Sequence, residues 1–263
     1  ISLGLVGSEM CIRDSDTSHS TVKWGLGTSQ IGGVFNTISP LIYYGVVRDH
    51  WDDPATLGRY QGLTSTTAHE IVEIMTDADP LRRFGEKAWW DHGTGEEIED
   101  FCNTVRFKYS SGLEVEGYWS NLNANCVIPD GGPDDNLGDS TRVTNDGGTI
   151  LPTPACYFIF WGRDWQDRTA EPTKAGLIDL LQNKLLDENK KYFRRLQEYG
   201  CGLPTWGGAF QNNITPVPSG STVLQADVEQ FLEDTFEQGL IPFPAEGNLS
   251  LIHISEPTRP RLI

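Results

Sequence analysis

The segment from about residue 66 to residue 77 constrains the fold most, because its apolar residues follow a helical period. They recur at positions i, i+3, i+4 and i+7, which form one stripe along a helix: Ala68, Ile71, Val72 and Met75. The hydroxyl-rich run 64–67 offers N-cap residues, and Asp79-Pro80 disfavours any continuation of the helix. The pattern therefore predicts a helix that buries one face.

Other local patterns predict strands near this helix. Residues 41–47 and 156–161 are short, apolar and rich in aromatic or β-branched side chains, as buried strands are. Residues 103–109 and 113–119 alternate in hydrophobicity on either side of Ser110-Ser111-Gly112, which predicts a hairpin.

Two helical stretches are expected in the second half, over about 173–199 and 225–237. The first is expected to break near Asp187-Glu188-Asn189, with Gly200 as the residue that follows its C-terminus. These patterns together predict an α/β or α+β fold. We expect a mixed sheet flanked by helices, with the β-hairpin following the first helix.

Residues 129–150 are rich in glycine, aspartate, asparagine and proline, which predicts an acidic linker. A calcium site is the alternative for this run, although its spacing does not match an EF-hand loop. The formal net charge is −17, which disfavours nucleic acid and anionic membranes as partners and favours divalent cations. No apolar run approaches the roughly 20 residues of a membrane span.

Both ends of the chain resemble translated DNA-library adapter sequence. Residues 4–15 (GLVGSEMCIRDS) resemble a transposase adapter, and residues 249–260 (LSLIHISEPTRP) resemble its reverse complement. We therefore expect 1–15 and 249–263 to be adapter-derived and not natural, and the chain to be a metagenomic fragment. Four cysteines remain between these ends, and an even number favours disulfides in an oxidising compartment, with reduced core residues as the alternative.

The chemically distinctive motif is His69-Glu70-Ile71-Val72-Glu73 on the first helix. His69 and Glu73 are four residues apart and share a face, as in the first part of the H-E-x-x-H zinc motif, with Glu73 in place of the second histidine. Glu70 would act as a general base. By similarity to the gluzincin metallopeptidases, Glu97 would be the third ligand and Asp100 its supporting partner.

A His/Glu/Glu ligand set predicts a divalent metal, with Zn, Mn or Ca as candidates, because carboxylates favour harder ions than imidazole does. The alternative is a solvated glutamate-rich helix face, since short H-E-x-x-E patterns are frequent.

Three longer strings resemble the C-terminal half of the EXORDIUM / phosphate-induced-protein family and its bacterial secreted relatives. They are TTAHEIVEIMTDADP, AWWDHGTGEEIEDFC and VEGYWSNLNANC, within about residues 62–127. The resemblance implies a secreted or cell-surface protein associated with cell wall and matrix, and a disulfide between Cys102 and Cys126. FIFWGRDW, residues 158–165, is similar to the N-terminal half of the same family.

In the family, the N-terminal half precedes the His-Glu helix, whereas here it follows. We therefore expect a piece of tandem modules, because the Gly/Asp-rich linker falls at the junction, with a permuted relative as the alternative. Residues 16–128 would be the C-terminal-half type, 129–150 the linker and 151–248 the N-terminal-half type.

Trp89, Trp90 and Trp119 lie near the His-Glu motif in the sequence and could stack on sugar rings, with core packing as the alternative. The first functional hypothesis is a divalent-metal site in a secreted protein that acts in matrix or surface interaction. The alternatives are a metal-dependent, peptidase-like hydrolase and a carbohydrate-binding module. The corresponding partners are extracellular matrix, a polysaccharide or a peptide.

Overall fold

A computed structural model describes most of the chain. The described residues are 17–23, 41–48, 59–78, 87–102, 105–128, 143–167, 169, 171–188, 191–215, 225–241 and 249–255. The N-terminal adapter-like run 1–15, most of the expected linker and the Asp79-Pro80 helix stop lie outside them.

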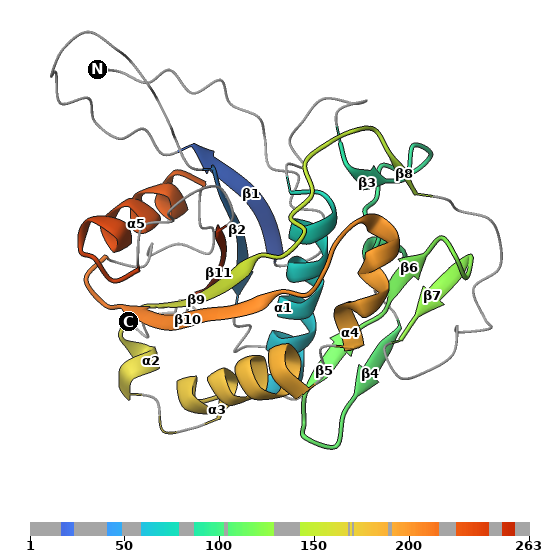
Figure 1. The fold of residues 1–263 in the computed structure, drawn as a ribbon. Helices are drawn as coiled ribbons and strands as arrows, with labels where there is room; N and C mark the ends of the chain where they lie inside the picture. The colour runs from blue at the N-terminus through green and yellow to red at the C-terminus, as the bar shows by residue number, and fades with distance from the viewer. Residues whose placement is uncertain are drawn as a thin grey trace, which may run out of the picture.

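The centre of the molecule is a five-stranded sheet in the order β1-β2-β11-β9-β10 (Figure 1). Its strands are β1 (Thr17–Lys23), β2 (Leu41–Arg48), β9 (Ala155–Trp161), β10 (Thr205–Asn212) and β11 (Leu249–Ser255). β1 is antiparallel to β2, and the other neighbours are parallel. The expected mixed sheet is therefore confirmed, and with its flanking helices the fold is of mixed α and β type.

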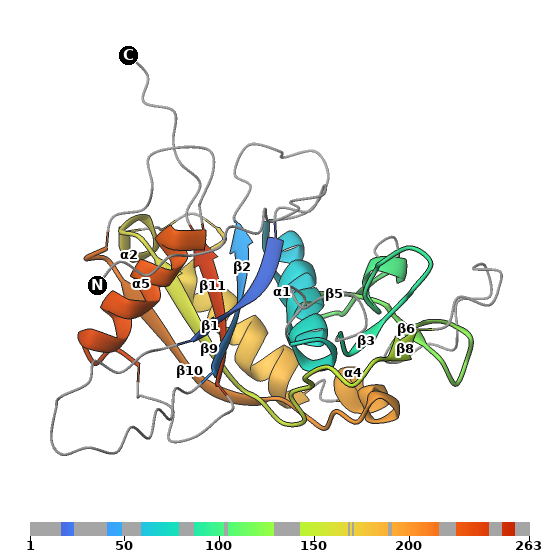
Figure 2. The ribbon, with the colours of Figure 1, turned by 90° about the horizontal axis from the view of Figure 1, so that it is seen from above.

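β9 divides the apolar core into two layers, because successive side chains of a strand point to opposite faces. Cys156, Phe158 and Phe160 lie in the larger core on one face. Ile159 and Trp161 pack on the other face against α5 (Gln225–Glu237). Seen from above, α5 lies on one side of the sheet and α1 (Arg59–Thr76) on the other (Figure 2).

Helix α1 (Arg59–Thr76) carries the predicted apolar stripe into the larger core. It begins earlier than expected, so the hydroxyl residues expected as N-caps lie inside the helix. They find other partners there. Thr67 Oγ1 donates to the Leu63 carbonyl at 2.6 Å, and Ser65 Oγ donates to Glu116 Oε1 at 3.0 Å.

The predicted hairpin forms beside α1 from β4 (Arg106–Lys108) and β5 (Glu114–Glu116), which pair antiparallel on either side of Gly112, whose φ is 90°. The pairing is shorter than predicted, because residues 118–120 pair with β7 (Asn125–Val127) instead. The short elements on this side of the molecule are β3 (Trp89–Trp90), η1 (Asp100–Cys102), β4 (Arg106–Lys108), β5 (Glu114–Glu116), β6 (Tyr118–Ser120), β7 (Asn125–Val127) and β8 (Thr144–Asn145). β6 pairs with β7, and β3 pairs with β8.

A broken helical run connects β9 to β10. It consists of α2 (Asp164–Asp167), α3 (Lys174–Asp179), the π-helical η2 (Leu180–Glu188), α4 (Lys191–Arg194) and the 3₁₀ segment η3 (Arg195–Tyr199). Gly200 follows with a left-handed φ of 82°, as the sequence predicts. None of the described helices is both long and apolar enough to cross a membrane.

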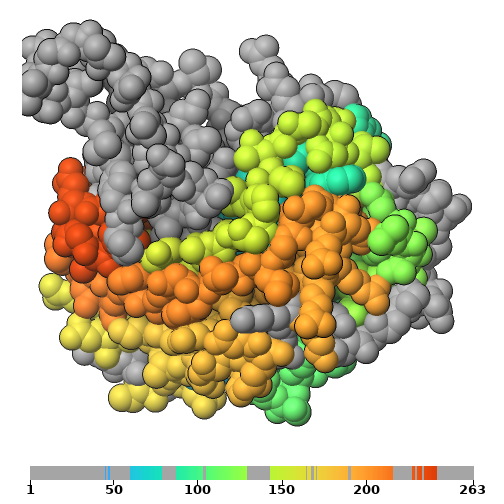
Figure 3. Space-filling model, in the orientation of Figure 1, coloured from blue at the N-terminus to red at the C-terminus, as the bar shows by residue number. Residues whose placement is uncertain are grey.

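One core unites the two parts of the chain on either side of the expected linker. Ile71 and Val115 pack in the same cluster as Leu177 and Phe193. Within the expected linker, Val143 is buried, β8 pairs with β3, and the Gly148 nitrogen donates to the Lys87 carbonyl. Residues 143–150 are therefore hydrogen-bonded to the rest of the fold, although β8 itself is exposed. The space-filling view shows the surfaces of residues 143–155 and 191–212 adjoining (Figure 3). The tandem-module origin of the two parts stays a prediction.

β11 occupies the middle of the sheet, although it belongs to the adapter-like run 249–263. Its backbone pairs over seven residues with β2 on one side and with β9 on the other. The structure thus uses this segment as the strand that joins the two parts of the sheet.

Candidate metal centre

Helix α1 and strand β5 position the site. Thr64 Oγ1 accepts a hydrogen bond from the Glu114 backbone nitrogen at 3.1 Å, and Ser65 contacts Glu116 as described above. These bonds fix the first half of α1 against β5. One turn later, His69 therefore faces the end of β5 and the segment that leads into η1.

Both ring nitrogens of His69 face carboxylates. Nε2 lies 2.9 Å from Glu73 Oε1 and 4.0 Å from Asp100 Oδ1. Nδ1 lies 3.2 Å from Glu116 Oε2 and 3.4 Å from Glu99 Oε2. His69 is only 8% exposed, and Glu73, Glu99 and Glu116 are at most 5% exposed, so water screens these charges weakly.

Three residues of α1 form a group that could hold a metal ion: His69, Glu70 and Glu73. One ligand atom from each lies within 4.8 Å of the others, and all three residues are buried. Glu70 lies against β2, because a Cβ built on Gly45 would be 3.3 Å from its Cβ and from its Oε2. A glycine at this point of β2 therefore leaves room for the Glu70 carboxylate.

The electrostatics of the site favour added positive charge. Burial lowers the pKa of His69, whereas the neighbouring carboxylates of Glu73, Glu99 and Glu116 raise it. Together the carboxylates outweigh burial, so the pKa of His69 lies well above its ordinary value. Burial raises the pKa of Glu99 well above its ordinary value. Burial and the Glu73 charge raise the pKa of Asp100 to about 6. Each shift favours the more protonated form, which is the form with less negative charge.

The structure brings together only part of the predicted ligand set. His69 and Glu73 are in contact, and Glu70 lies with them. Glu97 is buried, and its backbone nitrogen donates to Asp100 Oδ2 at 3.1 Å, but its carboxylate does not belong to the group of three. The roles of Glu97 as a ligand and of Asp100 as its supporting partner stay predictions.

Sequence reasoning missed Glu99 and Glu116. On β5, Glu114 and Glu116 alternate with Val115, a pattern that indicates a solvated face for the glutamates. In the structure all three side chains are buried, because α1 covers the glutamate side. Only the tertiary packing of α1 on β5 shows that these acids are enclosed.

The predicted tryptophans are well packed. Trp90 and Trp119 are 3% and 4% exposed, and their Nε1 atoms donate to Asp146 Oδ2 at 2.8 Å and to Asn121 Oδ1 at 3.1 Å. Trp89 is half-buried, and its Nε1 donates to the Tyr199 carbonyl at 2.8 Å. Sugar stacking by these rings therefore draws no support from their packing.

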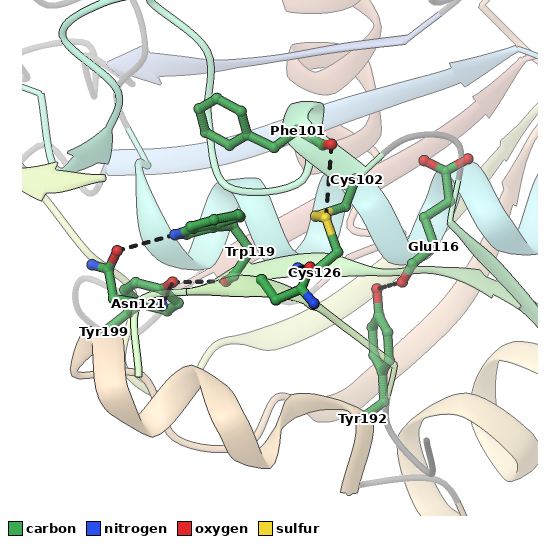
Figure 4. Close-up of a disulfide and its surroundings, with 9 residues drawn as sticks. Phe101, Cys102, Glu116, Trp119, Asn121, Cys126, Tyr192 and Tyr199 are labelled. Carbon is green, nitrogen blue, oxygen red and sulfur yellow. Dashed lines mark hydrogen bonds between the residues drawn. A yellow bond between two sulfur atoms is a disulfide. The ribbon is translucent and has the colours of Figure 1, made fainter. Parts of the chain in front are cut away.

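A disulfide between Cys102 and Cys126 joins η1 to β7 (Figure 4). It is the pairing that the family resemblance implies. The Cys102 nitrogen also donates to the Glu99 carbonyl at 2.8 Å. The disulfide therefore anchors the segment that carries Glu99 and Asp100. Cys156 and Cys201 are both buried.

Comparisons with protein-family profiles, with curated proteins and with solved structures found no match to this chain. The resemblance to the EXORDIUM family therefore stays a prediction.

Proposed function

We propose that this chain is an extracellular protein that binds a divalent cation at the His69 centre and acts in matrix or surface interaction. The observation that carries the proposal is the excess of enclosed acid around one imidazole. Four carboxylates lie within 4.0 Å of the His69 ring nitrogens: those of Glu73, Glu99 and Glu116 are buried, and that of Asp100 is partly exposed. Enclosed like charges are costly unless a cation or protons offset them.

His69 Nε2 and Glu73 Oε1 are the best-placed pair of ligand atoms, at 2.9 Å from each other. Ligands that each lie about 2.0–2.2 Å from a tetrahedral zinc ion are roughly 3.4 Å apart, so the pair needs to separate by only about half an ångström to share one ion. Glu70 is the third member of the group, and its carboxylate offers a further oxygen.

The donor set favours Zn²⁺ or Mn²⁺ over Ca²⁺, because imidazole suits zinc and other transition metals whereas calcium takes oxygen ligands. The disulfide fits an oxidising compartment, which supports an extracellular location.

Calorimetric titration of the metal-free protein with Zn²⁺ and with Mn²⁺ tests the proposal. We expect one cation per chain. Glu73→Gln should weaken binding by more than the roughly 10- to 100-fold that loss of a supporting residue costs, because it removes a ligand. Glu237→Gln is the matched control, since Glu237 is exposed at the end of α5. Absence of binding to the unmodified chain would refute the proposal.

A metal-dependent hydrolase is a second candidate, favoured by the position of Glu70 beside His69 and Glu73. In this role Glu70 is not a ligand of the cation but takes the proton of an attacking water, and a general base of this kind contributes about 10²- to 10⁴-fold. Glu70→Gln should then abolish peptide hydrolysis while the bound zinc is retained. If the zinc-loaded chain cleaves no peptide in a mixed-sequence library, the hydrolase hypothesis fails and cation binding alone remains.

A further inference from the structure

We propose that Glu116 is the positioning residue of the His69 centre, which fixes the ring so that Nε2 points to the cation. This inference rests on the proposed cation binding. It concerns a residue on β5 that is outside the His-Glu motif and outside the three-residue group.

Glu116 is held at both carboxylate oxygens. Its Oε2 lies 3.2 Å from His69 Nδ1 and is the hydrogen-bond acceptor for that nitrogen. Its Oε1 accepts from Ser65 Oγ at 3.0 Å and lies 2.9 Å from an Arg106 guanidinium nitrogen. These donors come from α1 and β4, so the carboxylate cannot turn away without breaking contacts to both elements.

The alternative acceptor for Nδ1 is Glu99, and its own hydrogen bond draws it elsewhere. Glu99 Oε1 accepts from the Tyr192 hydroxyl at 2.6 Å. The other oxygen lies 3.4 Å from Nδ1, which is longer than the Glu116 contact. The Tyr192 hydroxyl oxygen also lies 2.9 Å from the Glu116 carbonyl oxygen, the contact drawn in Figure 4. One tyrosine therefore contacts both glutamates.

A proton on Nδ1 leaves the Nε2 lone pair free for a cation. Histidines that bind metals almost always donate the other ring N–H to a carboxylate, a carbonyl or water, which fixes the tautomer and the ring orientation. Nε2 faces Glu73, the other well-placed ligand. The Nδ1–Glu116 bond therefore aims His69 at the cation position.

The test measures Zn²⁺ affinity by calorimetry in the full chain and in three variants. Glu116→Ala removes the acceptor, and we expect it to weaken binding by roughly 10- to 100-fold. Glu116→Gln keeps an acceptor for Nδ1, so it should recover most of the loss. Glu114→Gln is the matched control. Glu114 is also a buried glutamate, two residues away on β5, and its backbone nitrogen donates to Thr64 rather than to the His69 centre.

The ¹⁵N chemical shifts of the His69 ring at alkaline pH give a second readout that needs no cation. Because Glu73 Oε1 also accepts from Nε2 in the metal-free chain, at 2.9 Å, this readout is made in a Glu73→Ala background. There we expect the Nδ1–H tautomer with Glu116 or Gln at position 116, and a mixture of tautomers with Ala. Far-UV circular dichroism establishes that each variant folds. Arg106→Gln removes a contact of Glu116 at a more exposed position, so it should change the tautomer populations in the same direction as Glu116→Ala, but by less.

The two proposals fail in different ways. If the wild-type chain binds no cation, the proposed function is wrong, and the tautomer readout still decides the role of Glu116. If Glu116→Ala binds zinc as tightly as the wild type and keeps the Nδ1–H tautomer, the positioning role is wrong and cation binding stands.

Discussion

His69 lies among more carboxylates than its own charge can balance. Glu99 is completely buried, and its pKa is raised by that burial. The positively charged Arg106 side chain contacts Glu116, at 2.9 Å from Oε1, but it is 38% exposed. The metal-free site therefore depends on bound protons, which makes its stability sensitive to pH.

The metal-free fold should lose stability as pH rises. A group whose pKa is raised on folding contributes stability that is fully present below its unfolded pKa and is lost as pH rises through the folded value. For Asp100 this window runs from 3.8 to about 6, and for His69 it begins at 6.5 and extends above it. Urea unfolding in a chelator, from pH 4 to pH 9, measures this loss.

Two comparisons isolate the contribution of the site from that of the rest of the chain. Asp100→Asn should flatten the fall in stability between pH 4 and pH 6, because the amide does not titrate. Saturating zinc should remove most of the loss above pH 6.5, because the cation replaces the protons. An unchanged pH profile in both cases would contradict the expectation.

For single residues, the sequence predicted the contact between His69 and Glu73, because residues four apart on a helix share a face. It did not predict Glu99 and Glu116, which approach His69 from 30 and 47 positions further along the chain. Contacts of that separation depend on how the elements pack, and no local periodicity encodes them.

Among the elements, α1 and the N-terminus of α3 meet with almost no space between them. The Tyr60 hydroxyl accepts from the Thr173 nitrogen at 3.0 Å, and Thr173 in turn caps α3 through its hydroxyl. A Cβ added at Gly176 would lie 2.1 Å from the Tyr60 hydroxyl oxygen and 2.8 Å from its Cζ. The glycine is therefore required for this approach.

Gly176→Ala should destabilise the fold, by roughly 1–3 kcal/mol for an overpacked contact. The higher helix propensity of alanine offsets about 1 kcal/mol of this at most. Thermal and urea unfolding measure the difference. Gly93→Ala is the control, because a Cβ there comes no closer than 3.4 Å to Asp91. Equal stability of the two variants would show that Tyr60 moves aside freely.

Most elements with a regular apolar pattern could be predicted from the sequence. The predicted segments 41–47, 156–161 and 225–237 closely match β2, β9 and α5. β10 could not be predicted, since Gly207 and Gly208 interrupt its apolar alternation, and it forms because β9 supplies a parallel partner. The start of α1 was also missed, because Tyr60 and Leu63 extend the helix through packing.

For the molecule as a whole, β11 determines whether the sheet is continuous. It is hydrogen-bonded to both β2 and β9, so these two strands connect through it alone in the described sheet. The backbone pairing of β11 contributes on both edges, at about 1 kcal/mol for each hydrogen bond.

A chain that comprises residues 16–248 should therefore be less stable than the full chain by several kcal/mol, and prone to associate through the exposed edges of β2 and β9. Urea unfolding and size-exclusion chromatography measure the two effects. If the shorter chain keeps full stability and stays monomeric, β11 is dispensable. That outcome would support the interpretation that 249–263 is adapter-derived.

The place of β11 also sets the order in which the molecule can assemble. Leu249–Ser255 follows every other described element, yet it lies between strands that begin at Leu41 and Ala155. Contacts across such long stretches of chain form slowly, because loop closure must precede them. During synthesis, α1 and the β4–β5 hairpin can pack early around His69, while the sheet beside them closes only after its last strand has left the ribosome.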